Sequence, residues 1–262
     1  MSNNAQRRRI KMYMNERLHE IMKELNETNY ATVEYLAEKM HISSSSVRRD
    51  LAALEERGLV IRSYGGVELA DSVNRNVPFT MRKLAYISEK KRIAAAAAKL
   101  VKEGDVVFAD GSSTCFVLFE ELAKIKGITV ITNSIDGLFF LSSYQTKTIS
   151  SGGVTSGENR SVLVGHAAEK TFLEMHADIA FISAQGVDED GNIFDGYLSE
   201  IPIRNIMLKN SRHKVFLADK SKIGRLSAYR QCDFDDVDTV ISEVGLEEIY
   251  GERYKNTEFI QV

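Results

Sequence analysis

Cysteine, long hydrophobic runs and charge of one sign are all scarce in this chain of 262 residues. The two cysteines, Cys115 and Cys232, lie far apart in no CxxC or Cys/His cluster, which excludes a disulfide framework and a zinc site. No apolar run is long enough for a signal peptide or a membrane span. We therefore predict a cytoplasmic protein with no metal, no cofactor and no membrane partner.

The formal net charge is only -3, so bulk charge gives no indication of nucleic-acid binding. Residues 1–70 carry 11 Lys and Arg against 10 Asp and Glu, a weak asymmetry with the slightly acidic remainder. Such charge sums give little information about nucleic-acid binding, because only the face that meets phosphate must be positive. The hydrophobic content of 44% is typical of a soluble globular protein, and the length favours two domains.

The first 70 residues show three helical patterns followed by two short strands. Apolar residues recur at helical spacing over residues 9–25. A second helix is predicted over 33–40 with Thr32 as its cap, and a third over 44–57. Residues 59–69 then have the pattern of a hairpin around a Gly-Gly turn. This order predicts a winged helix-turn-helix domain over residues 1–70 and a polar linker over residues 71–80.

The third predicted helix has the chemistry of a DNA-contacting helix. In a helix-turn-helix the second helix enters the major groove, where its first turns contact bases and phosphates. Here that helix opens with four consecutive serines, residues 43–46, followed by Arg48 and Arg49. Each residue alone has an ordinary explanation, such as a helix cap or a surface arginine. Together with the turn and the wing, they predict contact with double-stranded DNA.

Residues 81–262 alternate between apolar runs and helical patterns, which predicts an α/β domain with a mostly parallel sheet. In such sheets ligands bind at the carboxyl ends of the strands. Small polar residues or glycine follow each predicted strand, and the turn 111–114 has hydroxyl and N–H groups suited to a phosphate. Lys222, in another strand-end loop, is a candidate cation for the same ligand. A turn of this kind is common, so by itself it is a weak signal.

The motifs in residues 32–67 resemble the winged helix-turn-helix of the DeoR family of bacterial sugar-metabolism repressors. They include Val47-Arg48-Arg49-Asp50-Leu51 and Tyr64-Gly65-Gly66-Val67. The resemblance extends through Thr132-Asn133-Ser134 and Leu217-Ala218-Asp219, and so covers residues 8–242. It implies that the Arg-Arg-Asp-Leu helix is the recognition helix. The DNA-binding residues implied are Ser44, Ser45, Ser46, Arg48, Arg49 and Tyr64.

The family resemblance also implies a sensor domain similar to ribose-5-phosphate isomerase and CoA transferases, which binds a phosphorylated sugar or a related metabolite. The implied effector-binding residues are Asp110, Ser112, Ser113, Thr114, Asn133, Gly152, Gly153, Gly186, Glu200 and Lys222. The chain departs from the family pattern at several positions. Ser112 stands where glycine is usual, Ser183 and Gln185 replace Gly and Asp, and Arg204 replaces a common lysine. These departures leave the identity of the effector open.

The mechanism expected from the resemblance is a homo-oligomer, a dimer or a tetramer, that represses genes of sugar metabolism until the effector releases it from the operator. One alternative is an enzyme similar to a sugar-phosphate isomerase or transferase. Residues 191–196 replace the lysine-containing loop of the isomerases, and no G-x-S-x-G motif occurs. Another alternative is a winged helix that binds protein instead of DNA, which changing Arg48 and Arg49 to alanine would distinguish.

Overall fold

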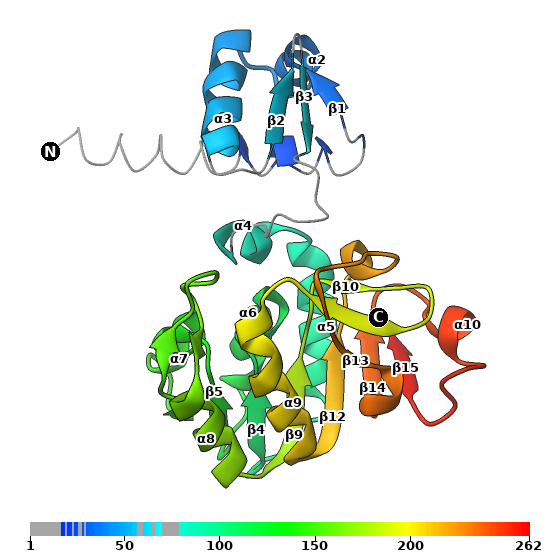
Figure 1. Cartoon of the computed structure of the whole chain (residues 1–262). Coiled ribbons are helices and arrows are strands. Elements are labelled where there is room, and N and C mark those ends of the chain that lie inside the picture. The colour runs from blue at the N-terminus through cyan, green and yellow to red at the C-terminus, as the bar shows by residue number, and fades with distance from the viewer. Residues whose placement is uncertain are drawn as a thin grey trace, which may run out of the picture. The chain divides into compact units, whose positions relative to one another are not determined.

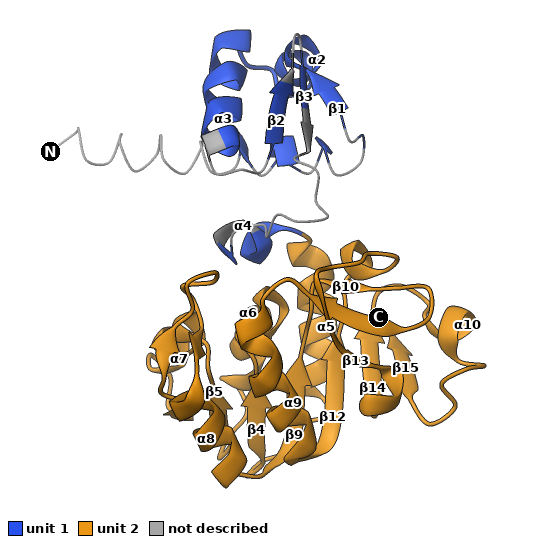
Figure 2. Cartoon of the chain, in the orientation of Figure 1, with its two compact units in different colours: residues 1–85 blue, residues 86–262 orange. Residues whose placement is uncertain are grey.

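The computed structural model describes residues 79–262 continuously, and before them residues 17–18, 20–22, 24–25, 28, 30–56, 60–63 and 66–69. The chain divides into two compact units, residues 1–85 and 86–262 (Figure 2). No helix among the described residues has the length and the apolar character needed to cross a membrane.

Unit 1 contains the predicted helix-turn-helix and wing (Figure 1). Helix α2 (Val33–Lys39) starts at Thr32, whose hydroxyl accepts a hydrogen bond from the Tyr35 N–H, and α3 is Ser44–Glu56. Strands β2 (Val60–Ser63) and β3 (Gly66–Leu69) form the antiparallel wing. The structure adds β1 (Tyr30–Thr32), which pairs with β3. Three residues are too few to show an alternating pattern, so the sequence did not predict this strand.

A single apolar core holds unit 1 together. Its helical face is the predicted one, since the inward positions of three helices are fully buried: Leu18, Ile21, Leu25, Leu36, Val47, Leu51 and Leu54. Helix α4 (Phe79–Leu84) also belongs to this unit, and it begins within the last two residues of the predicted linker. The other predicted linker residues, 71–78, lie outside the described residues.

Two buried carboxylates orient the helix-turn-helix. Asp50 of α3, 2% exposed, accepts hydrogen bonds from Arg17 Nε at 2.7 Å and Nη2 at 3.0 Å. Glu24 accepts a hydrogen bond from the Tyr35 hydroxyl at 2.6 Å and also pairs with Lys39. Both partners belong to α2. The described residues around 17 and 24 are helical. Glu24 connects this N-terminal segment to α2, and Asp50 connects it to α3. Asp50 of the Arg-Arg-Asp motif therefore orients the helix and does not face outward.

Replacing Asp50 with alanine is expected to destabilise unit 1 by about 2 kcal/mol, because the Arg17 guanidinium loses both charge-assisted hydrogen bonds. Urea unfolding followed by circular dichroism measures this loss. Glu38→Ala, an exposed carboxylate on α2, is the control and should change stability little. Equal stabilities of the two variants would contradict the orienting role of Asp50.

Unit 2 is built on a seven-stranded sheet in which every neighbouring pair is parallel, which confirms the predicted fold class. The strand order is β15-β14-β12-β9-β4-β5-β6. The strands are β4 (Val106–Ala109), β5 (Thr129–Thr132), β6 (Lys147–Ser150), β9 (Ala177–Ile182), β12 (Ser211–Leu217), β14 (Thr239–Ser242) and β15 (Glu258–Gln261).

Helices cover both faces of this sheet (Figure 1). Along β4 the side chains alternate, so that Val107 and Ala109 join one core and Phe108 joins the other. The first core contains residues of α5 (Ile87–Ala98), α6 (Ser113–Leu122) and α7 (Ile135–Leu141). The second contains residues of α8 (His166–Glu174) and α9 (Ile201–Lys209). A sheet buried on both faces reads as continuous apolar runs, which is why the sequence predicted it.

Two smaller antiparallel sheets were not predicted. Strands β10 (Gly186–Val187), β11 (Asn192–Asp195) and β13 (Tyr229–Asp233) form a three-stranded sheet, and β7 (Val154–Thr155) pairs with β8 (Leu163–Val164) in a hairpin. The remaining short elements are η1 (Leu198–Glu200), η2 (Lys220–Lys222), η3 (Phe234–Asp236) and α10 (Glu247–Tyr250). Most of these strands have two to four residues, so they carry little periodicity of their own.

Candidate functional site

The first turn of α3 is ordered by its serines. The Ser43 hydroxyl accepts from the Ser46 N–H at 3.2 Å, so Ser43 caps the helix. Its oxygen also lies 2.9 Å from Ser45 Oγ and 3.0 Å from Ser46 Oγ. Ser44, Ser45 and Ser46 retain partly or fully exposed surfaces, and none belongs to the core. The turn thus presents hydroxyl groups at the positive end of the helix.

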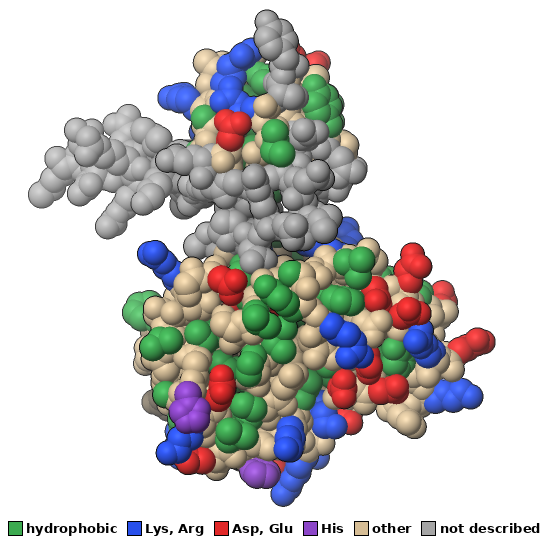
Figure 3. Space-filling model, viewed as in Figure 1, with side chains coloured by type: hydrophobic (Ala, Val, Ile, Leu, Met, Phe, Trp, Pro, Cys, Tyr) green, Lys and Arg blue, Asp and Glu red, His purple; other side chains and the backbone are tan. Residues whose placement is uncertain are grey.

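Arg48 and Arg49 of α3 are both exposed, whereas Val47, Asp50 and Leu51 beside them are buried. Figure 3 shows Lys and Arg side chains gathered over this helix. Arg48 Nη2 is 3.8 Å from Glu34 Oε1, and Arg49 Nη2 donates to Ser46 Oγ at 3.5 Å. Exposed contacts of this kind are weak, so both guanidinium groups are available to a phosphate or a base. The predicted wing residue Tyr64 lies outside the described residues.

In unit 2 the carboxyl end of β4 leads directly into α6 through Asp110 and Gly111. The Ser112 hydroxyl accepts from the Cys115 N–H at 3.1 Å and caps the helix, which starts at Ser113. The sequence pattern placed residues 111–114 in a turn, whereas Ser113 and Thr114 belong to the first turn of the helix. Their N–H groups have no partner within the helix and point towards its N-terminal end. Such an end is a favourable place for an anion.

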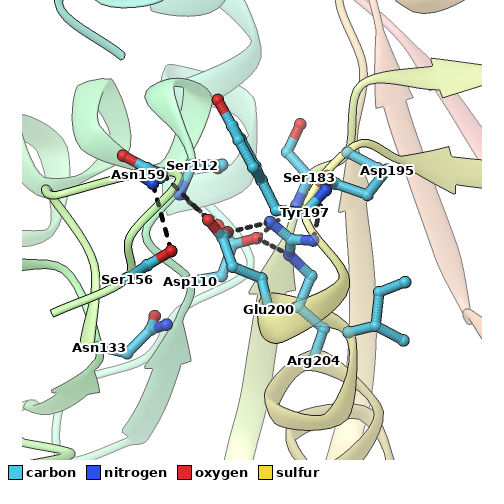
Figure 4. A network of polar contacts seen from close by, with 12 residues as sticks. Asp110, Ser112, Asn133, Ser156, Asn159, Ser183, Asp195, Tyr197, Glu200 and Arg204 are labelled. Carbon is cyan, nitrogen blue, oxygen red and sulfur yellow. Dashed lines mark hydrogen bonds and ion pairs between the residues drawn. The ribbon is translucent and has the colours of Figure 1, made fainter. Parts of the chain in front are cut away.

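A buried guanidinium joins four segments around Asp110 (Figure 4). Arg204 of α9 donates through Nε to Asp110 at 2.8 Å and through Nη2 to Glu200 at 2.6 Å, and its Nη1 lies 3.0 Å from Asp195. Burial disfavours the charged guanidinium, but the three carboxylates outweigh it and raise the pKa of Arg204. Asp110 also accepts from the Ser183 N–H at 3.1 Å, which links β4 to β9.

A second buried group of charges lies beside the start of α6. Lys90 of α5 is 3% exposed and donates to Ser113 Oγ at 3.4 Å. Lys222 donates to the Ala184 carbonyl at 2.8 Å and lies 3.9 Å from Asp219 Oδ2. Burial opposes ionisation of Asp219, but Lys222 and Lys90 more than offset it and lower the pKa of Asp219. Two buried ammonium groups and one carboxylate therefore lie together in this region.

The hairpin β7–β8 covers the ends of β4 and β5. Val162 packs so tightly on Gly111 that a Cβ at residue 111 would lie 1.9 Å from its Cγ1. The Asn133 side-chain amide donates to the Leu163 carbonyl at 3.1 Å, and Asn159 donates to Glu200 Oε1 at 3.1 Å. Asn133 Oδ1 is buried and accepts no hydrogen bond in the structure. Buried acceptors without a donor are rare, so this atom suggests a missing partner.

The three glycines predicted at the site have different surroundings. Gly152 and Gly153 are exposed at the base of the hairpin, with φ of 65° and 102°. Both conformations favour glycine. Gly186 is buried in β10, and a Cβ there would lie 2.0 Å from the Arg225 carbonyl oxygen. The structure thus gives each of these glycines a backbone reason, apart from any contact with a ligand.

The structure brings together Asp110, Ser112, Ser113, Thr114, Asn133, Glu200 and Lys222 at one edge of the sheet. It adds Lys90, Asn159, Asp195 and Arg204, which sequence reasoning did not select. Two signals in the sequence were available. One was a lysine in the alanine-rich helix α5, and the other was the spacing of Glu200 and Arg204 by one helical turn. Neither signal distinguishes a buried residue from an exposed one.

The site contains no reactive thiol. Cys115 and Cys232 are both buried, and burial raises the pKa of each above its usual range. Within the described residues no group of three or more His, Cys, Asp or Glu side chains is placed to hold a metal ion.

Two family models match the chain. The DeoR-like helix-turn-helix domain matches residues 17–73, and the DeoR C terminal sensor domain matches residues 86–244. The chain belongs to the DeoR family. This regulator therefore combines a DNA-binding unit with a sensor unit, as the recognition motif around Arg48 and the strand-end loops predicted.

Relatives align with nearly the whole DeoR-family chain. The HTH-type transcriptional repressor GlcR of Bacillus subtilis is 32% identical over 234 residues, with 88% of this chain and 89% of that protein covered. The HTH-type transcriptional regulator GolR of Listeria innocua is 30% identical, with 88% and 91% covered. The glycerol-3-phosphate regulon repressor of Escherichia coli is 26% identical, with 88% and 92% covered. The regulator is thus similar to transcription regulators along both units.

Solved structures resemble parts of the regulator more distantly. Ribose 5-phosphate isomerase A of Methanocaldococcus jannaschii has a TM-score of 0.38 and 22% identity, with 51% of this chain and 53% of that chain covered. The eIF2B delta structure from Chaetomium thermophilum has a TM-score of 0.45 and 10% identity, with 75% and 60% covered. These likenesses are too distant to indicate a function.

Proposed function

We propose that this DeoR-family regulator represses genes of sugar metabolism in the cytoplasm and leaves its operator when a phosphorylated sugar or related metabolite binds the edge of the sheet. Residues 1–70 bind DNA, residues 71–80 link the domains, and residues 81–262 sense the effector. The observation that carries the proposal is the buried positive region formed by Lys90 and Lys222 at the N-terminus of α6.

The DNA-binding half of the proposal rests on α3. Its Val47, Leu51 and Leu54 are buried, while Arg48, Arg49 and the opening serines are partly or fully exposed. Ser44, Ser45 and Ser46 contact bases or phosphates, and Tyr64 contacts DNA from the wing. One such module reads too few base pairs for specificity, so a dimer or tetramer places two recognition helices on paired half-sites.

The sensing half rests on the chemistry of the strand ends. A phosphate group accepts hydrogen bonds from Ser113 and Thr114 and is neutralised by Lys90 and Lys222. Ser112 shapes this end of α6 as its cap, and Asp110 and Asn133 bind the remainder of the molecule. Turnover is not part of the proposed function, since residues 191–196 stand in place of the lysine-containing loop that the resemblance to the isomerases implies.

The direct test is binding of the full-length protein to DNA from upstream of its own gene, repeated with millimolar sugar phosphates. We expect specific binding that one or more phosphate esters weaken by tenfold or more, which corresponds to about 1.4 kcal/mol of coupling. Operator affinity that is the same with every phosphate ester would contradict effector release. Conversion of a sugar phosphate by the purified protein would support the enzyme alternative.

The two lysines provide a more local test. Lys90→Ala is expected to weaken phosphate-ester binding by about tenfold to a hundredfold, since one charge-assisted contact is lost, while operator binding is retained. Isothermal titration calorimetry measures the effector affinity. Lys91→Ala, the exposed neighbour on α5, is the matched control. If both variants bind the effector like the wild type, Lys90 does not contact the phosphate.

A further inference from the structure

The ligand site has two halves of opposite charge, which meet at Ser183 and Ala184. The Ala184 carbonyl accepts from Lys222, and the Ser183 N–H donates to Asp110. On the Lys222 side lies the buried ammonium pair. On the Asp110 side, three carboxylates share the single guanidinium of Arg204. A ligand that spans the site therefore meets a positive region at one end and a negative region at the other.

The negative half has one cation for three carboxylates. The Arg204 guanidinium lies 2.8 Å from Asp110, 3.0 Å from Asp195 and 2.6 Å from Glu200, although its Nη1 makes no hydrogen bond. All four side chains are at most 3% exposed, so water screens their charges little. The remaining charge of this cluster is negative.

An acceptor in the same half also lacks a hydrogen-bond partner. Asn133 donates to the Leu163 carbonyl, which can only accept, and this contact fixes the orientation of the amide. Its Oδ1 is left buried without a donor and 3.6 Å from the position of a Cβ built on Gly111. A hydroxyl group can donate a hydrogen bond to this oxygen, whereas a carboxylate or a second phosphate cannot.

We propose that the effector is a monophosphate ester with an uncharged, hydroxyl-bearing far end, and that the carboxylate cluster around Glu200 excludes phosphorylated sugar acids and bisphosphates. The inference rests on the proposed function and specifies its ligand. The phosphate lies at Ser113, Lys90 and Lys222, and the far end reaches Asn133. Anionic far ends are rejected because they would be desolvated beside like charges, a form of discrimination by repulsion.

The test compares alcohol and acid pairs that differ only in the far-end group. The pairs are glycerol 3-phosphate with 3-phosphoglycerate, erythritol 4-phosphate with 4-phosphoerythronate, and glucitol 6-phosphate with 6-phosphogluconate. Inorganic phosphate serves as a probe of the positive half alone. Calorimetric titration of the full-length protein is expected to show tighter binding of the alcohol in the best-bound pair, by tenfold or more.

A pair of variants identifies the residues responsible. Glu200→Gln removes one negative charge, and it should bring the acid-to-alcohol affinity ratio about tenfold closer to unity. Glu158→Gln is the matched control, since Glu158 is exposed on the hairpin and accepts only a 3.4 Å contact from Ser199 Oγ. Its ratio should equal that of the wild type. Thermal unfolding verifies that both variants are folded.

Each result has a distinct meaning. Equal or tighter binding of the acids, or of fructose 1,6-bisphosphate over fructose 6-phosphate, overturns the inference while the proposed function stands. If Glu200→Gln does not fold, the wild-type ratios alone decide. If no phosphate ester and no inorganic phosphate binds at millimolar concentration, the proposed function fails, and the inference fails with it.

Discussion

Replacing Arg48 and Arg49 together with alanine is expected to weaken operator binding about a hundredfold or more, with the fold of unit 1 retained. Each guanidinium that contacts a base or phosphate contributes about 1–3 kcal/mol. Both side chains are exposed and make only weak contacts with Glu34 and Ser46, so their loss removes little from the core. A fluorescence anisotropy titration with labelled operator DNA measures the affinity.

Salt dependence separates DNA contact from an indirect effect. If both arginines contact phosphates, the double variant lowers the slope of log K against log salt concentration by up to about 2. Arg212→Ala, whose side chain is 86% exposed in the other unit, is the control and should leave affinity and slope unchanged. Unchanged operator binding by the double variant would refute α3 as the recognition helix.

Replacing Arg204 with methionine is expected to destabilise unit 2 by about 3–5 kcal/mol. Methionine fills much of the same volume, but Asp110, Asp195 and Glu200 then remain buried without their common cation. A loss of this size lowers Tm by about 10 °C for a domain of this length. Differential scanning calorimetry on the full chain measures it, because the two units are separate compact bodies.

Two further variants define the role of Arg204. Arg204→Lys keeps the charge but places its donors on one nitrogen instead of three, so its stability should fall between those of the wild type and Arg204→Met. Arg212→Met changes an exposed arginine in the same way, and its stability should stay within about 0.5 kcal/mol of the wild type. A fully stable Arg204→Met protein would show that the carboxylates do not depend on the guanidinium.

The sequence indicated the position of Arg48 more clearly than it indicated the position of Arg204. The position of Arg48 followed from helical spacing, because Val47 and Leu51 mark the buried face and leave the next residue outside. Arg204 was visible only as a departure from a family pattern. Its neighbour Asp110 is 94 positions earlier in the chain. No local periodicity relates two residues so far apart.

The helices and strands also differ in how far the sequence predicted them. The caps of α2 and the long apolar strands were predictable, since caps and periodicity depend on a few consecutive residues. Ser113 and Thr114 were predicted to lie in a turn, because they are polar and interrupt the apolar pattern although both are helical. The hairpin β7–β8 was missed because paired strands of two residues carry almost no pattern.

The sequence by itself determined the helix-turn-helix unit with the helix that we propose contacts DNA, the α/β class of the second unit and the polar residues that end its strands. All of these follow from short-range patterns. Only the tertiary structure decided which polar residues meet. The order β12-β9-β4-β5 places Lys222, Ser183, Asp110 and Asn133 along one edge, and the hairpin brings Asn159 to Glu200. Strand order depends on how distant segments pack, so the two oppositely charged halves of the site appear only in the folded chain.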